Sequence, residues 1–266
     1  MKSITTAPRS SGALALAATT LATLVAVVAL WHLLTAGLGV ISAARFPPPL
    51  EVAQALQQIT LDGYSNGRLH EHVLRSVLLV TMGFAVASSI GVVLGLAMGA
   101  SRTVEALVNP VFLLLRPIPP LAWIPLAIVW LGLGDAAKMM VIFFAAFVPS
   151  VINSYAGVRQ IDKPIFEAAA MLDITGWRYW REVLVPGALP SIFTGLRLSL
   201  QASWTTLVAA ELVGAVAGLG QILNQAAQDI YPAMILVGMI SVALCGWLMT
   251  LGLAWLEQRV MPWKVR

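Results

Sequence analysis

Long apolar runs that lack charged side chains are the feature that most constrains the fold of this chain. The first run, 10–44, contains no Asp, Glu, Lys or Arg, and as a helix rising about 1.5 Å per residue it is long enough to cross a bilayer. Hydrophobic residues make up 59% of the chain and charged residues 11%, which excludes a soluble globular domain. The sequence therefore predicts an all-α membrane protein with about six transmembrane helices.

The N-terminal region has two interpretations. Lys2 and Arg9 precede the first apolar run, which is also how a secretory signal begins, and Ser42-Ala43-Ala44 would then be a cleavage site. Because the run is much longer than the apolar region of a signal, an uncleaved first helix is favoured. An external segment then follows, in which 50–59 is expected to form an amphipathic helix lying on the membrane.

Further stretches of spanning length occupy about 72–100, 106–133, 136–158, 189–213 and 232–256. The second carries Gly91, Gly95 and Gly99 at four-residue spacing, which leaves one helix face nearly bare and favours close helix packing. Chance spacing in a glycine-rich span is the alternative.

The third stretch is interrupted by Arg116, Pro117, Pro119 and Pro120. Proline removes a backbone donor, so a continuous helix has to kink or break here. Broken backbone at membrane depth is tolerated only where protein covers it or where it lines a water-filled path. The stretch therefore either shapes a translocation pathway or is a helix end from which Arg116 reaches the interface.

The longest polar interruption is 161–190. Lys163-Pro164 is typical of a helix start, and an apolar stripe at helical spacing follows it. A break at 173–176 precedes a second amphipathic piece, 177–185, which is expected to end at Pro186. Two short helices joined by a turn, placed between spans, predict a docking surface. The stripe consists of Ile165, Ala168, Ala169 and Leu172.

Isolated charges inside a span need a partner or water. Arg197 and Glu211, fourteen positions apart in the fifth span, are each expected to form a salt bridge near a membrane interface, although a proton relay is the alternative. His70 and His72 are expected to be solvated loop residues.

Several classes of site are missing from the sequence. It contains no Gly-Lys dipeptide and hence no phosphate-binding loop, no metal-ligand spacing and no nucleophile elbow, so neither a catalytic nor a metal site is predicted. The single cysteine, Cys245, cannot form an intramolecular disulfide. Lys and Arg are not grouped on one element with aromatic residues, so a nucleic-acid partner is not expected.

Six spans place both termini on one side, and the positive-inside rule assigns that side to the cytoplasm. The basic residues that would lie inside are Lys2, Arg9, Arg102, Arg159, Lys163, Arg178, Arg181, Arg259, Lys264 and Arg266, and those outside are Arg45, Arg68 and Lys138. The expected divisions are 1–70 (first helix and external segment), 71–258 (membrane domain) and 259–266 (short cytoplasmic tail).

The polar interruption resembles the EAA loop of ABC importer permeases. The match rests on Glu167-Ala168-Ala169, a turn position at Asp173, and Val183, Val185 and Pro186. Asp173 stands where that family usually has glycine, and Val185 where it usually has leucine. The resemblance implies that Glu167, Ala168, Ala169, Asp173, Gly176 and Pro186 belong to an ATPase-coupling loop.

A second resemblance, covering roughly 70–264, is to the permeases of nitrate, taurine and aliphatic sulfonate importers, and is closest to the taurine subfamily. It rests on the segments 116–138, 147–162 and 186–212. It implies a type I ABC importer permease fold in a bacterial inner membrane, surrounded by lipid and working as a homodimer. The partners would be a cytoplasmic ATPase dimer, which binds ATP and Mg²⁺, and a periplasmic or lipid-anchored solute-binding protein.

The resemblance also implies that Gln221 and Asn224 belong to an outer gate-lining segment. A nitrate or other small-anion or heterocycle importer is the alternative solute assignment. An ion-coupled secondary transporter would ordinarily show paired repeats and ionisable groups at mid-membrane, and neither is evident here. A membrane anchor without a transport role is the third interpretation.

Overall fold

The computed structural model describes residues 10–42 and 45–263, and these residues form helices without a strand. The helices are α1 (Ser10–His32), α2 (Pro49–Leu61), α3 (Leu69–Ala100), α4 (Arg102–Leu115), α5 (Ile124–Leu131), α6 (Asp135–Arg159), α7 (Lys163–Met171), α8 (Gly176–Tyr179), α9 (Val185–Gly214), α10 (Leu219–Gln228) and α11 (Pro232–Val260). Short π-helical segments at Leu33–Gly37 and Trp180–Leu184 and a 3-10 turn at Pro120–Trp123 connect some of them. The N-terminal Lys2 and Arg9, and Ala43 and Ala44 of the cleavage motif, lie outside the described residues.

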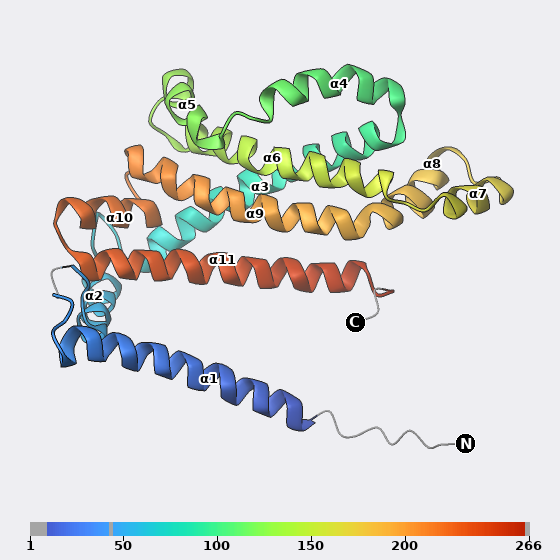
Figure 1. Cartoon of the computed structure of the whole chain (residues 1–266). Helices are drawn as coiled ribbons and strands as arrows, with labels where there is room; N and C mark the ends of the chain where they lie inside the picture. The colour runs from blue at the N-terminus through green and yellow to red at the C-terminus, as the bar shows by residue number, and fades with distance from the viewer. Residues whose placement is uncertain (1–9, 43–44, 264–266) are drawn as a thin grey trace, which may run out of the picture.

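Five helices are long and apolar enough to span a membrane, and the total is six when α4 and α5, bent by 82° at their break, count as one span. The prediction of an all-α membrane protein with about six spans is thus confirmed. The start of α1, the end of α11, and α7 and α8 lie at one end of the bundle, whereas α2, α5 and α10 lie at the other (Figure 1).

Three helices, α3, α6 and α9, form the centre of the bundle. Gly91, Gly95 and Gly99 of α3 face α6. A Cβ added at Gly91 would lie 2.8 Å from the Ser150 Cβ, and one added at Gly99 would lie 2.6 Å from the Val158 Cβ. A Cβ added at Gly95 would overlap the Val151 carbonyl oxygen. The bare face thus lets two backbones approach closely, which strengthens dispersion contacts between membrane helices.

Buried hydroxyl groups join the same three helices. Ser150 of α6 lies 2.8 Å from Ser199 of α9 and 3.3 Å from Ser88 of α3, and Ser199 donates to the Ala146 carbonyl at 2.7 Å. Each hydroxyl finds a partner where water is absent, so small polar residues hold the three spans together without a packing penalty.

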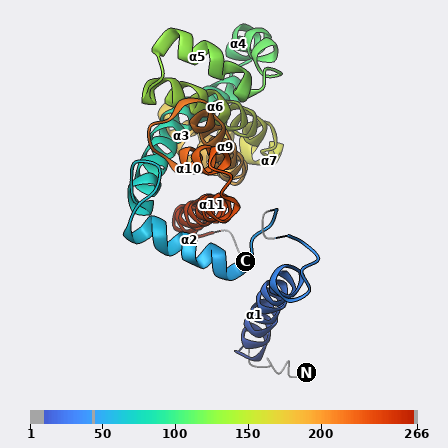
Figure 2. The ribbon, with the colours of Figure 1, turned by 90° about the vertical axis from the view of Figure 1, so that its left-hand side faces the viewer.

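The first helix stands apart from the bundle and is connected to it through α2 (Figure 2). The Trp31 indole N–H donates a hydrogen bond to the Pro47 carbonyl at 3.0 Å, and the Trp31 and Phe46 ring centroids lie 5.5 Å apart. These two contacts fix the end of α1. The position of α2 on the membrane stays a prediction, and the structure shows that one face of this helix packs on the bundle. Its apolar face, Val52, Ala55 and Ile59, is buried in the same core as α11 and α3.

Two helix boundaries also differ from expectation. The third stretch begins before 106, because 101–105 is the capped start of α4, in which the Ser101 hydroxyl accepts from the Val104 amide at 3.4 Å. The helix that starts at Gly176 does not end at Pro186 but continues to Gly214. Proline is tolerated because it falls in the first turn of α9, directly after the π-helical turn that widens the backbone.

Candidate functional site

The turn between α7 and α8 has a defined left-handed geometry. Asp173 has φ +52°, and the amides of Asp173 and Ile174 donate to the carbonyls of Ala170 and Ala169 at 3.1 and 3.0 Å. This is the Schellman ending of a helix, in which the residue after the cap is usually glycine. Aspartate tolerates that conformation better than most residues, so Asp173 preserves the turn that glycine would form.

The tip of this segment leaves large apolar side chains in contact with solvent. Met171 is 88% exposed, Trp177 77% and Leu172 71%, and Ile165 is exposed too. Of the predicted apolar stripe only Ala169 is buried against the chain. An exposed apolar group of this size on a polar segment is typical of a protein-binding surface, and we call Ile165, Met171, Leu172 and Trp177 the apolar tip.

The opposite side of the segment is firmly packed. Phe166 and Tyr179 contact each other at 6.3 Å between ring centroids and pack on the cluster of Leu96, Val158, Leu184, Ala188 and Ile192 at the ends of α3, α6 and α9. Gly187 leaves room for Ile161, since an added Cβ there would lie 2.7 Å from the Ile161 Cδ1. The segment is therefore anchored to the ends of three spans. Glu167 and Ala168 lie exposed on α7, Gly176 starts α8 with φ +61°, and Pro186 is half-buried in the first turn of α9.

An apolar groove of about 600 Å³ runs beside this segment. Val93, Leu96 and Ala97 of α3 form one wall, and Trp177, Trp180 and Arg181 form the other. The groove enlarges the apolar tip into a continuous surface at this end of the bundle.

At the opposite end, buried polar groups hold the start of α10; we call His72, Ser76 and Glu211 the α10 clamp. The Glu211 carboxylate accepts from the Gly220 amide at 2.7 Å and from the Ser76 hydroxyl at 2.8 Å. Ser76 in turn accepts from the Leu219 amide at 2.9 Å. The first amides of a helix lack intrahelical partners, and these side chains supply them.

Two sequence expectations are corrected here. Glu211 forms no salt bridge among the described residues; its side chain is completely buried and hydrogen-bonded. His72 is not solvated either. It is completely buried in the first turn of α3, where Nδ1 accepts from the Gly218 amide at 3.0 Å, so the protonated Nε2 donates to the Tyr64 carbonyl at 3.0 Å. The partners lie far away in sequence and only the fold brings them together. His70, two residues earlier, is exposed but also helical.

The other end of α10 is fixed by tyrosines. The Tyr64 hydroxyl donates to the Asp229 carboxylate at 2.5 Å, and the Tyr231 hydroxyl donates to the Gln58 side chain at 3.1 Å. Burial, followed by the contacts with Asp229, raises the pKa of the Tyr64 phenol, which keeps the hydroxyl protonated as a donor. Because both ends of α10 are tied, the helix is held as one rigid piece across α2, α3, α9 and α11.

The broken span leans on α6 through aromatic rings. The rings of Trp123 and Phe144 stack with their centroids 4.2 Å apart, and those of Phe112 and Phe147 are in edge contact with their centroids 6.4 Å apart. Arg116, Pro117 and Pro119 are exposed at the break, and Pro120 starts the 3-10 turn. Gln221 and Asn224 lie half-buried on α10, which packs on α9 and α11. The predicted pathway-shaping residues therefore lie on separate elements and do not form one site.

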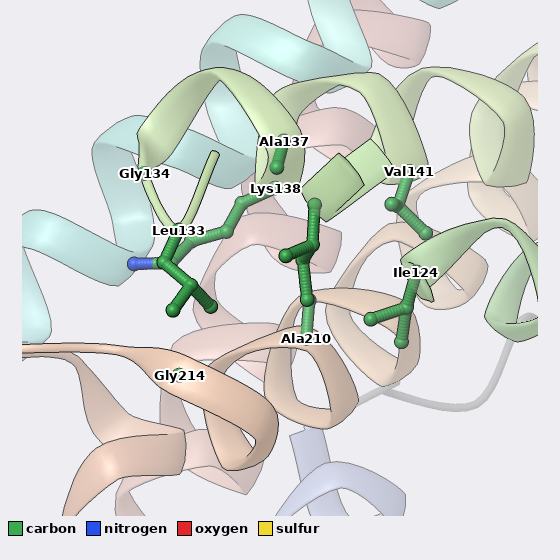
Figure 3. A pocket seen from close by; sticks show the side chains of 9 residues that line it. Ile124, Leu133, Gly134, Ala137, Lys138, Val141, Ala210 and Gly214 are labelled. Atoms are coloured by element: carbon green, nitrogen blue, oxygen red, sulfur yellow. The ribbon is translucent and has the colours of Figure 1, made fainter. Parts of the chain in front are cut away.

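A small cavity lies where α5, α6 and α9 meet (Figure 3). Ile124, Leu133, Lys138 and Ala210 are among the residues that line its volume of about 10 Å³, and Lys138 pairs with Asp135 at 3.3 Å. That volume holds at most one water molecule. The cavity is a packing space and not a solute site.

The exposed face of α9 carries a stripe of polar side chains that the sequence analysis missed. Thr194, Arg197, Gln201 and Thr205 recur at helical spacing and are exposed. The predicted salt bridge of Arg197 is confirmed, with Glu257 of α11 as the partner. The signal was available in the sequence, because polar residues three to four positions apart in an apolar span mark a face turned away from lipid.

Among the described residues no group of three or more His, Cys, Asp or Glu could hold a metal ion. What the geometry offers is mechanical, namely a docking surface at one end, an anchored helix at the other, and three spans that connect them.

Comparisons with known proteins agree with this geometry. The profile of the family described as "Binding-protein-dependent transport system inner membrane component" matches residues 88–263. The chain is 36% identical to the taurine transport system permease protein TauC of Escherichia coli (strain K12), over 91% of this chain and 88% of that protein. It is 32% identical to the putative aliphatic sulfonates transport permease protein SsuC of Bacillus subtilis (strain 168), over 90% of this chain and 84% of that protein.

The fold has a relative among solved structures as well. A structure of the MetNI methionine ABC transporter in inward-facing conformation superposes with a TM-score of 0.55 at 24% sequence identity, and covers 73% of this chain and 96% of that chain. The type I ABC importer permease fold that the sequence resemblance implied is thereby confirmed.

Proposed function

The chain belongs to the family of binding-protein-dependent transport system inner membrane components, and we propose that the solute it imports is taurine or another small sulfonate. It is the permease subunit of an ABC importer. The sulfonate assignment is supported by the names of the relatives TauC and SsuC, each matched over most of its length.

A cytoplasmic ATPase dimer docks on the segment 161–190 in this proposal. The observation that carries it is the apolar tip, which is exposed to solvent while its back is packed onto the ends of α3, α6 and α9. A rigid lever with an unpartnered apolar face is what a motor subunit needs in order to move spans. Glu167, Ala168, Ala169, Asp173, Gly176 and Pro186 would act through packing and helix geometry, not through chemistry.

The remaining partners follow from the same topology. The end of the bundle that carries α2 and α10 faces a periplasmic or lipid-anchored binding protein, and both termini are cytoplasmic. Two copies of the chain form the pathway within the lipid of a bacterial inner membrane. The division into 1–70, 71–258 and 259–266 is kept in this proposal, with the family profile falling almost entirely in the second part.

The chain itself is non-catalytic in this proposal. ATP and Mg²⁺ are held by the ATPase, whose closure draws the two docked segments together and turns the pathway from inward-facing to outward-facing. Hydrolysis then resets it. In this cycle the chain converts a movement at one end into an opening at the other.

The first experiment measures ATP hydrolysis by the chain reconstituted with its ATPase and binding protein, with and without taurine. Stimulation by taurine that disappears when this chain is omitted supports both the importer and the solute. Stimulation by nitrate but not by taurine replaces the solute with that of the nitrate permeases that the sequence also resembles. Uptake without any ATPase contradicts the proposal in favour of an ion-coupled secondary transporter.

A further inference from the structure

A groove of about 440 Å³ lies between α9 and α11, which run side by side through the bundle (Figure 1). Its α9 wall includes Arg197, Gln201, Trp204 and Thr205, and its α11 wall includes Gly246 and Thr250. The volume is within the range of small-molecule sites, roughly 300–1,000 Å³. We call it the α9–α11 groove.

The groove offers hydrogen-bond donors that the described residues do not satisfy. The Trp204 side chain is 5% exposed, and its Nε1 has no hydrogen-bond partner among the described residues. A buried indole N–H usually has an acceptor. The Gln201 carboxamide, one turn of α9 away and exposed, forms no hydrogen bond within the described part of the chain either.

The groove also contains a cation. Arg197 contacts Glu257 through Nη2, and this leaves the other N–H groups of its planar guanidinium, which is half exposed, free to bind an anion. The hydroxyls of Thr205 and Thr250 donate to carbonyls of their own helices at 3.1 and 2.8 Å. Their oxygens remain as acceptors, and the free donors around the groove are those of Arg197, Gln201 and Trp204.

We propose that the α9–α11 groove is a transient binding site for a small oxyanion, recognised by Arg197, Gln201 and the Trp204 indole N–H. The inference deepens the proposed function, on which it rests, because it gives the permease its own recognition of an anionic solute. Partial neutralisation of Arg197 by Glu257 suits such a site, since a solute in transit has to leave as readily as it enters.

The test uses cysteine chemistry, because the chain has only one native cysteine. Two single-cysteine variants are made in a Cys245→Ser background. Gln201→Cys lies in the groove. Leu244→Cys is the comparison, because Leu244 is 53% exposed and lies on the face of α11 opposite to Val242 and Gly246, which line the groove. Both are reconstituted with the ATPase and binding protein in phosphatidylcholine nanodiscs. Each is treated with a sulfonate-bearing and a trimethylammonium-bearing methanethiosulfonate.

We expect Gln201→Cys to react with the sulfonate reagent at least about tenfold faster than Leu244→Cys, because a cationic cleft concentrates anions. We expect methanesulfonate to protect it, and Arg197→Gln to abolish the preference for the anionic reagent. Thr205→Cys, one turn further along α9, repeats the measurement should Gln201→Cys fail to insert.

Equal rates at both cysteines would overturn the proposal, because the groove would then concentrate no anion. Protection by added phosphatidylglycerol but not by methanesulfonate would overturn it too, since the anion would be a lipid headgroup. Taurine-stimulated ATP hydrolysis by the reconstituted Cys245→Ser chain, which keeps Gln201, separates the two proposals. If that activity is present and the labelling fails, only the groove is wrong; if it is absent, the proposed function is wrong.

Discussion

The Glu211 Oε2 atom in α9 lies 2.7 Å from the backbone nitrogen of Gly220 at the start of α10. The carboxylate is completely buried, and an acidic side chain without exposure is rare unless it is fully hydrogen-bonded. Gly220 has to be a glycine here, since an added Cβ would lie 2.6 Å from the Glu211 Cβ. The close approach of these two residues therefore fixes the angle at which α10 leaves α9.

Glu211→Leu is predicted to destabilise the protein. It leaves the Gly220 amide and the Ser76 hydroxyl without an acceptor in a water-free site, at a cost of about 1–3 kcal/mol for each. A thermal unfolding midpoint in detergent should fall for Glu211→Leu, and fall less for Glu211→Gln, which keeps one acceptor. Glu51→Gln, an exposed acid on α2, is the matched control and should leave the midpoint unchanged. An unchanged midpoint in Glu211→Leu would show that the clamp contributes nothing.

Glu167→Pro is predicted to uncouple transport while the protein stays inserted. Proline inside a short helix removes a hydrogen bond and costs about 3 kcal/mol or more, and α7 has only nine residues. Insertion depends on the apolar spans, and α7 lies outside them, so the amount in the membrane fraction should match wild type while solute-stimulated ATP hydrolysis disappears. Loss of the variant from membranes would refute the separation of coupling from insertion.

Substitutions at Asp173 test the left-handed turn. Asp173→Gly should preserve coupling and raise the free energy of unfolding by up to about 1 kcal/mol, because glycine adopts φ near +52° without strain. Asp173→Val should lower it by about 1–3 kcal/mol, since a β-branched residue is strained there. Denaturant unfolding and ATPase co-purification measure both effects. If valine proves harmless, the turn is not required.

Gly95→Ala is predicted to prevent close packing of α3 on α6. Its Cβ would overlap the Val151 carbonyl oxygen, and overpacking typically costs about 1–3 kcal/mol. Gly252→Ala on α11 is the control, because no atom outside its own helix turns lies within 4 Å of an added Cβ. The fraction of monodisperse protein after extraction should drop for the first variant and not for the second. Equal yields would contradict the packing role of the glycine face.

Much of the architecture could be predicted because its causes are local. Apolar runs mark the spans, Lys163-Pro164 starts α7, and the break at 173–176 separates α7 from α8 wherever the rest of the chain lies. Prolines 117, 119 and 120 interrupt the third span for the same reason. The two short helices of 161–190 were predicted from the same short-range pattern, including the turn at Asp173.

Pro186 shows where a local rule failed. Proline ends helices in general, but here a π-helical turn directly before it absorbs the distortion and α9 continues. Whether proline stops or only widens a helix depends on the packing of Val183 and Leu184 against the neighbouring helices, which the sequence does not display.

The sequence by itself determined that the chain spans a membrane, approximately where its spans lie, and that a helix–turn–helix segment separates two of them. Only the tertiary structure decided that Glu211 is buried, that His72 is part of a clamp and that Gln201 and Trp204 border a groove. The physical reason is distance along the chain. Periodicity and proline act within a few residues, whereas Glu211 meets Ser76 across 135 positions, and such a hydrogen bond exists only once the helices have packed.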